Sequence, residues 1–506
     1  MILILDFGSQ YTQLIARKIR GLHIFAEIAP YHLSLREIRE KNPKGIILSG
    51  GPASVLEKGA PTIAPGILEL GIPILGICYG MQLLTKLSGG RVKRSSTREY
   101  GRADIHASDQ SDLFHGLPAC STVWMSHGDS VGAPPPGFER IAHSGDCPVA
   151  AMRDPGRSIF GVQFHPEVHH TPHGVKILRN FAKRICRHKS DWRMSDFVER
   201  TTRELRERIG KKRILCGVSG GVDSTVLAVL LHRAVGSRLK SVFVDNGLLR
   251  EGEARTVIDR FRKIGIPVKF VQASKQFLNP LKGVKNPERK RRIIGRVFID
   301  VFFRELKKTD LLAQGTLYPD VIESVSVRGP SATIKTHHNR VKEVLRLEKQ
   351  NRLVEPLKDL FKDEVREVGK ELELPEEVLL RQPFPGPGLG VRILGAVTPE
   401  RLSVLRKADV ILLEEIKSAG LYHKIWQTFC VLLPIRSVGV MGDERTYDNA
   451  VAIRAVKSMD GMTADWVRIP HKILSRISGR IINEVAGINR VVYDISTKPP
   501  STIEWE

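Results

Sequence analysis

The chain has 506 residues, of which 42% are hydrophobic and 26% are charged, so its composition excludes an intrinsically disordered protein. Its length exceeds what one hydrophobic core supports and predicts about three domains. No apolar run reaches the roughly 18 residues that a membrane helix needs, so we expect no membrane partner. The formal net charge of +24 allows a nucleic-acid partner, but it also fits solvated basic surfaces.

The N-terminus and the cysteines indicate a reducing compartment. Residues 1–5 form an apolar run that meets Asp6 without a basic leader or a cleavage site, so they predict a strand and not a signal peptide. The six cysteines include no C-x-x-C pair, which argues against a zinc site and against a disulfide framework. We therefore expect a cytoplasmic location.

In the first 190 residues, short apolar runs alternate with helical patterns. Strands are expected at residues 2–5, 46–48 and 72–77, and a helix is expected at residues 10–20. This alternation is typical of an α/β domain with a mainly parallel sheet.

The third of these strands leads into a G-x-C-x-G motif centred on Cys78. Gly76 and Gly80 permit a sharp turn from strand to helix that exposes the central side chain. A helix N-terminus also favours the thiolate, which is the nucleophilic form of cysteine. A single cysteine is, however, most often an inert buried residue.

An alternating strand is expected at residues 160–167, and it ends with His165 and Glu167 two positions apart. Pro166 keeps the chain extended, and side chains two positions apart in an extended chain point the same way. Glu167 can therefore orient His165, while His165 serves Cys78 first as a base and later as an acid.

Together, the cysteine motif and the H-P-E string resemble the class I glutamine amidotransferase family. The resemblance implies that Cys78, His165 and Glu167 form the catalytic triad. An S-G-G-P string resembles the family's oxyanion loop, which implies that the amides of Gly51 and Tyr79 face the developing negative charge. The resemblance also implies a set of glutamine-binding residues, namely Gln82, Ser126, His127, Gly128 and Asp129.

A polar stretch without an apolar period, residues 186–191, marks the first domain boundary. A helix is expected next, because Phe197 and Ile209 lie on one apolar face and Gly210 follows. The second domain then opens with an apolar run at residues 214–218.

That run leads into a glycine hexamer, Ser219-Gly220-Gly221-Val222-Asp223-Ser224, and a helix-like run follows at residues 225–235. Adjacent glycines let successive N–H groups point into one hollow and the helix adds its positive end, so the loop suits phosphate. The serine hydroxyls can donate to phosphate oxygens, and Asp223 can help to hold a magnesium ion. The hexamer lacks the lysine of the usual G-x-x-x-x-G-K-[ST] loop. A glycine turn that only caps a helix is the alternative.

The hexamer resembles the pyrophosphatase loop of ATP-dependent synthetases, which activate a substrate as its adenylate. The resemblance implies that residues 219–224 bind ATP and that AMP and pyrophosphate are released, with Mg²⁺ as cofactor and no prosthetic group. A strand is expected at residues 241–246, with Asp245 at the carboxyl end where α/β folds bind ligands, so Asp245 is a further candidate for ATP binding. The alternative is an ordinary turn after a strand.

The densest basic stretch, residues 282–308, has ten Lys or Arg against three acidic residues and a partly helical pattern. By itself it indicates a solvated face. Three strings closely resemble stretches of the GMP synthetase family: residues 286–295, 312–320 and 334–339. The resemblance implies that Arg291 contacts XMP. After residue 339, this chain differs from many bacterial members, because its pattern predicts a helix up to residue 353. Whether residues 340–353 act as a lid is therefore left open.

Three prolines and two glycines exclude a helix at residues 382–389, which mark a boundary or a binding loop. Gln382 stands where family members often have His. A strand is expected at residues 491–495. The residues after it would ordinarily fray, but their resemblance to the family implies that they contact XMP through Lys498, Ile503 and Glu504, with Lys498 suited to the phosphate.

We therefore predict an α/β protein with two doubly wound parallel-sheet domains and a smaller α+β domain. The expected domains are a class I glutamine amidotransferase at residues 1–190, an ATP pyrophosphatase at residues 191–381, and a dimerisation and XMP-binding domain at residues 382–506. Throughout its length the chain resembles the GMP synthetase family. The resemblance implies ATP-dependent amination of XMP with ammonia from glutamine, through an adenyl-XMP intermediate, in a homodimer.

Two alternatives remain at this point. An enzyme that modifies transfer RNA and shares the same loop would use the basic charge, but it leaves Cys78, His165 and Glu167 unexplained. A basic nucleic-acid binder without activity is opposed by intact catalytic motifs in both domains. We therefore do not expect nucleic acid as a partner.

Overall fold

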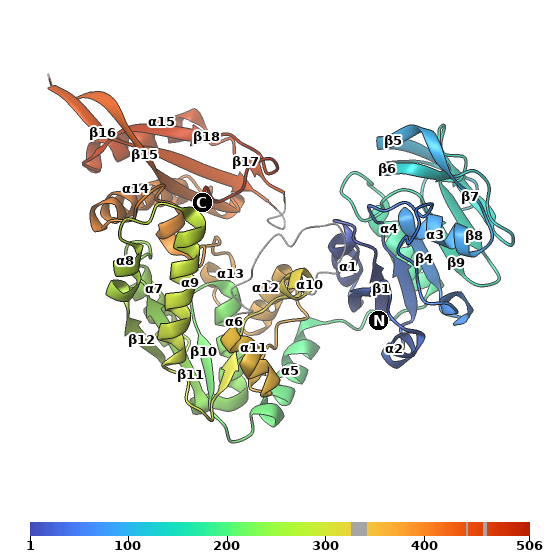
Figure 1. The fold of residues 1–506 in the computed structure, drawn as a ribbon, viewed down its shortest axis with the longest axis horizontal. Helices are drawn as coiled ribbons and strands as arrows, with labels where there is room; N and C mark the ends of the chain where they lie inside the picture. The colour runs from blue at the N-terminus through green and yellow to red at the C-terminus, as the bar shows by residue number, and fades with distance from the viewer. Residues whose placement is uncertain (325–341, 442–443, 459–462) are drawn as a thin grey trace. The chain divides into compact units, whose positions relative to one another are not determined.

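The computed structural model describes residues 1–324, 342–441, 444–458 and 463–506 (Figure 1). The chain forms two compact units, the first mainly from residues 1–196 and the second mainly from residues 197–318 and 337–506. Within the described ranges, none of the helices is both long and apolar enough to cross a membrane. All six cysteines are free thiols.

A nine-stranded sheet organises the first unit, in the order β2-β1-β3-β4-β9-β8-β7-β5-β6. Its strands are β1 (Ile2–Asp6), β2 (Ala26–Pro30), β3 (Gly45–Leu48), β4 (Ile74–Ile77), β5 (Val92–Ala107), β6 (Cys120–Val131), β7 (Glu139–His143), β8 (Ala151–Asp154) and β9 (Ile159–Val162). The neighbouring strands β2, β1, β3, β4 and β9 pair in parallel. The remaining strands, β8, β7, β5 and β6, pair antiparallel with their neighbours. The expected, mainly parallel sheet is confirmed by strands β2, β1, β3, β4 and β9, and antiparallel strands extend it on one side.

The predicted elements at the start of the chain are confirmed. The three predicted strands are β1, β3 and β4, and the predicted helix is α1 (Thr12–Arg20). The first four residues of β1 and all residues of β3 and β4 are buried, as in parallel strands covered on both faces. The other helices of this unit include α2 (Leu35–Lys41), α3 (Tyr79–Leu87) and α4 (Gly174–Arg179), and α4 continues as a π-helix at Asn180–Ile185. The sequence pattern did not indicate β2, since Glu27 interrupts its short apolar run.

A five-stranded parallel sheet organises the next part of the chain, in the order β12-β11-β10-β13-β14. Its strands are β10 (Ile214–Gly217), β11 (Leu239–Asp245), β12 (Val268–Gln272), β13 (Leu311–Ala313) and β14 (Leu353–Val354). The helices, in chain order, are α5 (Met194–Ile209), α6 (Val222–Val235), α7 (Glu253–Lys263), α8 (Ser274–Leu281), α9 (Pro287–Phe303), α10 (Tyr318–Ser324), α11 (Lys342–Lys349), α12 (Lys362–Glu371) and α13 (Glu376–Leu379). The strand order reverses between β10 and β13, which is the topological switch point of the sheet.

Two helices of the second unit have boundaries that differ from the expected ones. Helix α6 begins at Val222, so the glycine hexamer itself supplies the first helical turn. Helix α11 ends at Lys349, and the expectation of a helix up to residue 353 is wrong in its last turn. The reason is tertiary: Leu353 pairs with Leu312 of β13 and begins strand β14.

The last part of the chain is α+β, as expected. It consists of α14 (Pro399–Ser418), β15 (Gln427–Met441), β16 (Glu444–Lys457), β17 (Asp465–Trp466), α15 (His471–Glu484) and β18 (Ile488–Asp494). Strands β15 and β16 are antiparallel, β18 runs parallel to β16, and α14 and α15 lie beside these strands (Figure 1). The exclusion of a helix from residues 382–389 holds up to Pro387, because Gly388–Val391 form a 3₁₀ turn.

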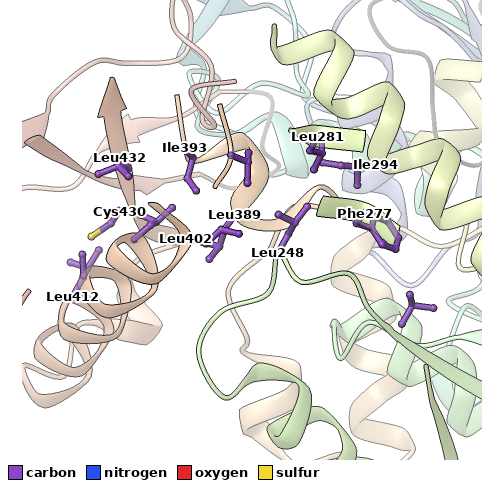
Figure 2. Close-up of a cluster of buried hydrophobic side chains, with 14 of the residues drawn as sticks. Leu248, Phe277, Leu281, Ile294, Leu389, Ile393, Leu402, Leu412, Cys430 and Leu432 are labelled. Atoms are coloured by element: carbon purple, nitrogen blue, oxygen red, sulfur yellow. The ribbon is translucent and has the colours of Figure 1, made fainter. Parts of the chain in front are cut away.

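A buried apolar cluster in the second unit crosses the expected boundary at residue 381 (Figure 2). Leu248 and Ile294, which precede that boundary, share this cluster with Leu389 and Leu402, which follow it. The two segments therefore share one hydrophobic core. The boundaries at residues 190 and 381 themselves remain predictions.

Candidate active sites

The predicted catalytic residues of the first unit lie at one edge of its sheet. Ser49, Cys78 and His165 follow β3, β4 and β9, which are neighbouring parallel strands. Because parallel strands present their carboxyl ends at the same edge, three segments far apart in sequence meet there. The structure therefore brings together the cysteine, the histidine and the glycine loop.

Cys78 occupies a strained turn between β4 and α3. Its φ of 51° and ψ of −104° are unusual for a residue with a side chain. The flanking glycines are needed for close approach: a methyl group at Gly76 would lie 2.6 Å from the carbonyl carbon of Gly80, and one at Gly80 would lie 2.5 Å from the carbonyl oxygen of Leu48. The thiol of Cys78 is 3.6 Å from the carbonyl oxygen of Ser126. The predicted nucleophile elbow is thus present as a conformation.

Gly80→Ala is expected to displace this elbow, because Leu48 Cβ would also lie 2.7 Å from the new methyl group and the backbone of β3 has to move. We expect a loss of about 1–3 kcal/mol in unfolding free energy and a loss of glutaminase activity. Thermal unfolding and glutamate release measure the two effects. Gly132→Ala is the control, since a methyl group there meets nothing within 4 Å. Equal behaviour of the two variants would contradict the steric argument.

His165 and Glu167 interact directly, although not as a strand pair. Strand β9 ends at Val162, so the expected extended strand up to residue 167 is wrong, and a turn places the two side chains instead. His165 Nδ1 and Glu167 Oε1 are 2.7 Å apart, and Glu167 is 1% exposed. Burial by itself would lower the pKa of His165, but the Glu167 carboxylate and a hydrogen bond with Cys78 together raise that pKa well above its ordinary value.

Glu167→Gln is expected to shift the pH dependence of glutamine hydrolysis. Without the carboxylate, burial dominates and the pKa of His165 falls, so the imidazolium that stabilises the Cys78 thiolate is lost at lower pH. The alkaline limb of the kcat/KM profile should therefore move down by about 1–3 pH units. Glu40→Gln, an exposed carboxylate on α2, serves as the control. An unchanged alkaline limb would contradict this role of Glu167.

The predicted oxyanion loop lies against the cysteine and the histidine. A methyl group at Gly50 would be 3.0 Å from His165 Cε1 and 3.7 Å from Cys78 Cβ. At Gly51 a methyl group would be 2.8 Å from the carbonyl oxygen of Phe7, so this position also requires glycine. The direction of the Gly51 and Tyr79 amides toward a substrate remains a prediction.

The residues predicted to bind glutamine surround the same edge, and several already have protein partners. Gln82 Nε2 donates to the carbonyl oxygen of Asp129 at 2.8 Å. The Asp129 carboxylate accepts from the hydroxyl of Ser54 at 2.5 Å. A methyl group at Gly128 would meet nothing within 4 Å, so space is open beside this backbone. Their role in glutamine binding remains a prediction.

His127 belongs to a buried polar group that the sequence pattern did not reveal. His127 Nε2 lies 3.1 Å from Glu99, and ligand-type atoms of His127, Glu99 and Cys147 lie within 4.8 Å of one another. Burial lowers the pKa of His127 even though Glu99 opposes this shift. Burial, reinforced by the Glu99 carboxylate, raises the pKa of the Cys147 thiol to about 12. Both pKa shifts favour the uncharged forms, which are the neutral imidazole of His127 and the protonated thiol of Cys147.

In the second unit, the glycine hexamer follows β10 at the switch point of the parallel sheet. The carboxyl end of β13, with Gln314 and Thr316, lies on the other side of that point. Open α/β sheets bind ligands in the crevice at such a point. Asp245 lies at the carboxyl end of the neighbouring strand β11, and its carboxylate accepts from the amide of Gly247 at 2.9 Å.

Hydrogen bonds within the loop and a hydrogen bond from Arg381 fix the conformation of the loop. Ser224 Oγ accepts from the amide of Ser219 at 3.1 Å, and Ser219 Oγ accepts from the amide of Gly221 at 3.3 Å. Arg381 donates to the carbonyl oxygen of Gly220 at 2.6 Å, which fixes this peptide with a φ of 73° at Gly220. The N-cap residue of α6 is Gly221, and the helix has no side-chain cap. The Asp and Ser of the loop therefore do not serve as its N-cap.

Asp223 has one paired and one unpaired oxygen. Its Oδ2 accepts from Lys362 Nζ at 3.3 Å, whereas its buried Oδ1 has no hydrogen-bond partner in the described part of the chain. An unpaired buried carboxylate oxygen is a suitable ligand for a magnesium ion. Lys362, Arg381 and Glu99 were missed by sequence reasoning, because their partners lie far away in sequence and no local pattern marks them.

Two family models match the chain, and so do relatives over its full length. Glutamine amidotransferase class-I matches residues 3–185, and the GMP synthase C terminal domain matches residues 414–505. A relative from Nitratidesulfovibrio vulgaris, named GMP synthase (glutamine-hydrolyzing), is 54% identical and covers 100% of this chain and 99% of its own. One of the same name from Wolinella succinogenes is 56% identical and covers 100% and 98%. The chain belongs to the glutamine-hydrolysing GMP synthase family.

The residues that are predicted to contact XMP differ in their surroundings. Lys498 borders an open hollow of about 600 Å³, whose other lining residues are Lys424, Lys457, Ser458, Thr463, Ala464 and the single acidic residue Asp465. Three lysines and two hydroxyl side chains suit a phosphate group.

The other predicted XMP residues are held by protein groups. Arg392 donates to both carboxylate oxygens of Glu504, at 2.9 and 3.1 Å. Arg291 donates to the main-chain oxygen of Glu506, and Ile503 is buried in a small apolar cluster. The structure therefore does not place Arg291, Ile503 or Glu504 in the hollow beside Lys498. The family string at residues 334–339 and the start of the segment considered as a lid lie outside the described residues.

Proposed function

We propose that this chain makes GMP from XMP, ATP and glutamine. The observation that carries the proposal is that one chain holds two built sites, the Cys78–His165–Glu167 group at one sheet edge and the phosphate loop at the switch point of another sheet. Glutamine hydrolysis supplies ammonia, and ATP activates XMP as an adenylate. The products are GMP, glutamate, AMP and pyrophosphate.

In the amidotransferase reaction, the Cys78 thiolate attacks the amide carbon of glutamine and a thioester forms. His165 gives its proton to the departing ammonia, and it later takes a proton from the water that hydrolyses the thioester. Glu167 holds the ring in place through the 2.7 Å contact. The amides of Gly51 and Tyr79 are proposed to stabilise the oxyanion.

In the synthetase reaction, the C2 oxygen of XMP attacks the α-phosphorus of ATP and pyrophosphate leaves. Ammonia then attacks C2, and AMP leaves with that oxygen. Residues 219–224 and Asp245 are proposed to bind ATP. Asp223 is the proposed ligand of Mg²⁺, which fits its unpaired Oδ1 among the described residues; the bound ion would neutralise phosphate charge.

The hollow beside Lys498 is proposed as the site of the XMP phosphate. Lys498→Ala should then raise the apparent KM for XMP by about tenfold or more and leave the KM for ATP nearly unchanged, since a charge-assisted hydrogen bond contributes about 1.5–3 kcal/mol. Lys472→Ala, an exposed lysine on α15, is the control. An unchanged KM for XMP in the Lys498 variant would reject this site.

We further propose that the chain forms a homodimer through its last sheet. The support is a set of exposed apolar side chains on β15, β16, β18 and their ends, which are Ile435, Val438, Val440, Tyr447, Val492 and Ile495. Val440, for example, is 73% exposed on β15. Burial of such an apolar surface against the same surface of a second copy of the chain would stabilise a dimer. Cytoplasmic location also remains a proposal.

The deciding experiment incubates the protein with XMP, ATP, Mg²⁺ and glutamine and separates the nucleotides. GMP together with AMP is the expected result, and ADP with phosphate would contradict the assignment of the loop. An enzyme acting on transfer RNA would leave XMP unchanged. A nucleic-acid binder would also leave XMP unchanged, and its retention of RNA or DNA would fall linearly with salt on a logarithmic scale.

A further inference from the structure

Residues 496–506, which we call the strap, run past three cationic side chains that are fully buried. Lys290, Arg392 and Arg454 are each 0% exposed, and each donates hydrogen bonds to the strap. Buried charges persist in folded proteins only where they are paired and hydrogen-bonded. The segment is therefore held in place by three internal cations and does not fray as a tail of this composition ordinarily would.

Lys290 and Glu506 form one anchor of the strap. Lys290 Nζ donates to the carbonyl oxygen of Ile393 at 2.6 Å and to the Glu506 carboxylate. The other carboxylate oxygen of Glu506 accepts from the amide of Gly395 at 3.2 Å. Both oxygens of this side chain are thus engaged by protein groups, and the neighbouring Arg291 donates to the main-chain oxygen of Glu506.

Lys498 lies at the other anchor. Its backbone pairs with Ala464 in both directions, at 2.8 and 3.0 Å, beside the hollow lined by Lys424 and Lys457. Arg454 donates to the carbonyl oxygen of Ser496, which precedes Lys498, at 2.6 Å and to that of Thr502, which lies between the two anchors, at 3.2 Å. The strap is therefore bonded to the protein body along its length and connects Lys290 to the edge of the hollow.

We propose that Glu506, bound by Lys290, is a positioning residue for nucleotide binding. It fixes the strap and thereby presents Lys498 to the hollow. Loss of this anchor shifts the end of the strap and, through the strap, the position of Lys498, which weakens phosphate binding in the hollow, while the phosphate loop and the Cys78 site keep their own supports. This inference rests on the proposed function, because it takes the hollow as the XMP site.

The test compares Glu506→Gln and Glu506→Asp in the full chain, with ammonium chloride as the nitrogen source. Glutamine keeps the size of the side chain but removes the charge that pairs with Lys290. Glu506→Gln is expected to raise the KM for XMP by about tenfold and to leave the KM for ATP and the glutaminase rate unchanged. Glu506→Asp, which keeps the charge, should recover most of the XMP affinity.

A second variant and a control separate positioning from general loss of structure. Lys290→Met should raise the KM for XMP similarly, and the double variant should be no worse than either single one, because both changes break one interaction. Lys282→Met, an exposed lysine of the same basic stretch, should behave as the wild type. Circular dichroism monitors folding.

The outcomes are distinct. An unchanged KM for XMP in a folded Glu506→Gln variant overturns the inference, as do equal increases in the KM for XMP and for ATP, which would indicate only a structural role. Additive effects of the two single variants also overturn it. If the wild type makes no GMP, the proposed function has failed instead.

Discussion

Cys78→Ala is expected to abolish GMP synthesis from glutamine while preserving synthesis from ammonia. The thiol is the only group at the elbow that can form the thioester, and neither His165 nor the oxyanion amides can replace it. Glutamine-driven synthesis should fall on the order of 10⁴-fold or more, as when other catalytic nucleophiles are removed. Ammonium chloride at alkaline pH supplies free ammonia directly, so the phosphate loop should still support GMP formation in this variant.

The measurement is GMP formation with each nitrogen source, together with glutamate release. Cys120→Ala is the matched control, because this exposed cysteine lies in the same unit but away from the elbow, at the start of β6. Two results would show that the assignment of separate sites is wrong. One is glutamine-dependent synthesis by the Cys78 variant, and the other is loss of its ammonia-dependent reaction while circular dichroism shows it folded.

Asp223→Asn is expected to reduce synthesis from both nitrogen sources by about 10²–10³-fold. The substitution preserves the shape of the side chain but removes the negative charge that pairs with Lys362 and that we assign to Mg²⁺. Both reactions pass through the adenylate, so both are affected equally. Glutamate release should continue, since the Cys78 site lies in the other unit and uses none of these groups.

The controls are a second aspartate and a Mg²⁺ titration. Asp259→Asn removes a surface carboxylate on α7 and should leave both activities unchanged. In Asp223→Asn, more Mg²⁺ should be needed for half-maximal activity with ATP. If synthesis from ammonia survives in this variant at the wild-type Mg²⁺ requirement, Asp223 does not hold the ion.

Where a backbone turn demands glycine, the sequence was sufficient to find the candidate sites. The turn around Cys78 leaves room only for hydrogen atoms at Gly76 and Gly80, because other backbone atoms lie within 2.6 Å of where a methyl group would be. Such a steric demand restricts the residue type at both positions, so the G-x-C-x-G string directly after an apolar strand indicated the turn in this chain. The same holds for the Gly220–Gly221 pair, whose first member has a φ of 73°.

The sequence also predicted strands β1, β3, β4, β10 and β11, whose residues are almost all buried. A buried parallel strand is a short continuous apolar run, which can be recognised without any partner. Residues 160–167 show the limit of this argument. The apolar pattern there continues past the end of β9 at Val162, and only the paired strands determine where hydrogen bonding stops.

Only the tertiary structure decided which charged groups pair. Asp223 meets Lys362, 139 residues away, and Lys290 meets Glu506, 216 residues away. Neither pair has a local signature, because each depends on how strands are ordered and on how segments pack against one shared core. A basic run such as residues 282–308 looks the same in sequence whether its lysines are solvated or buried. In the folded protein Lys282 is exposed, whereas Lys290 is completely buried. Lys290 can be buried because its ammonium group donates to a carboxylate and to two carbonyl oxygens inside the protein.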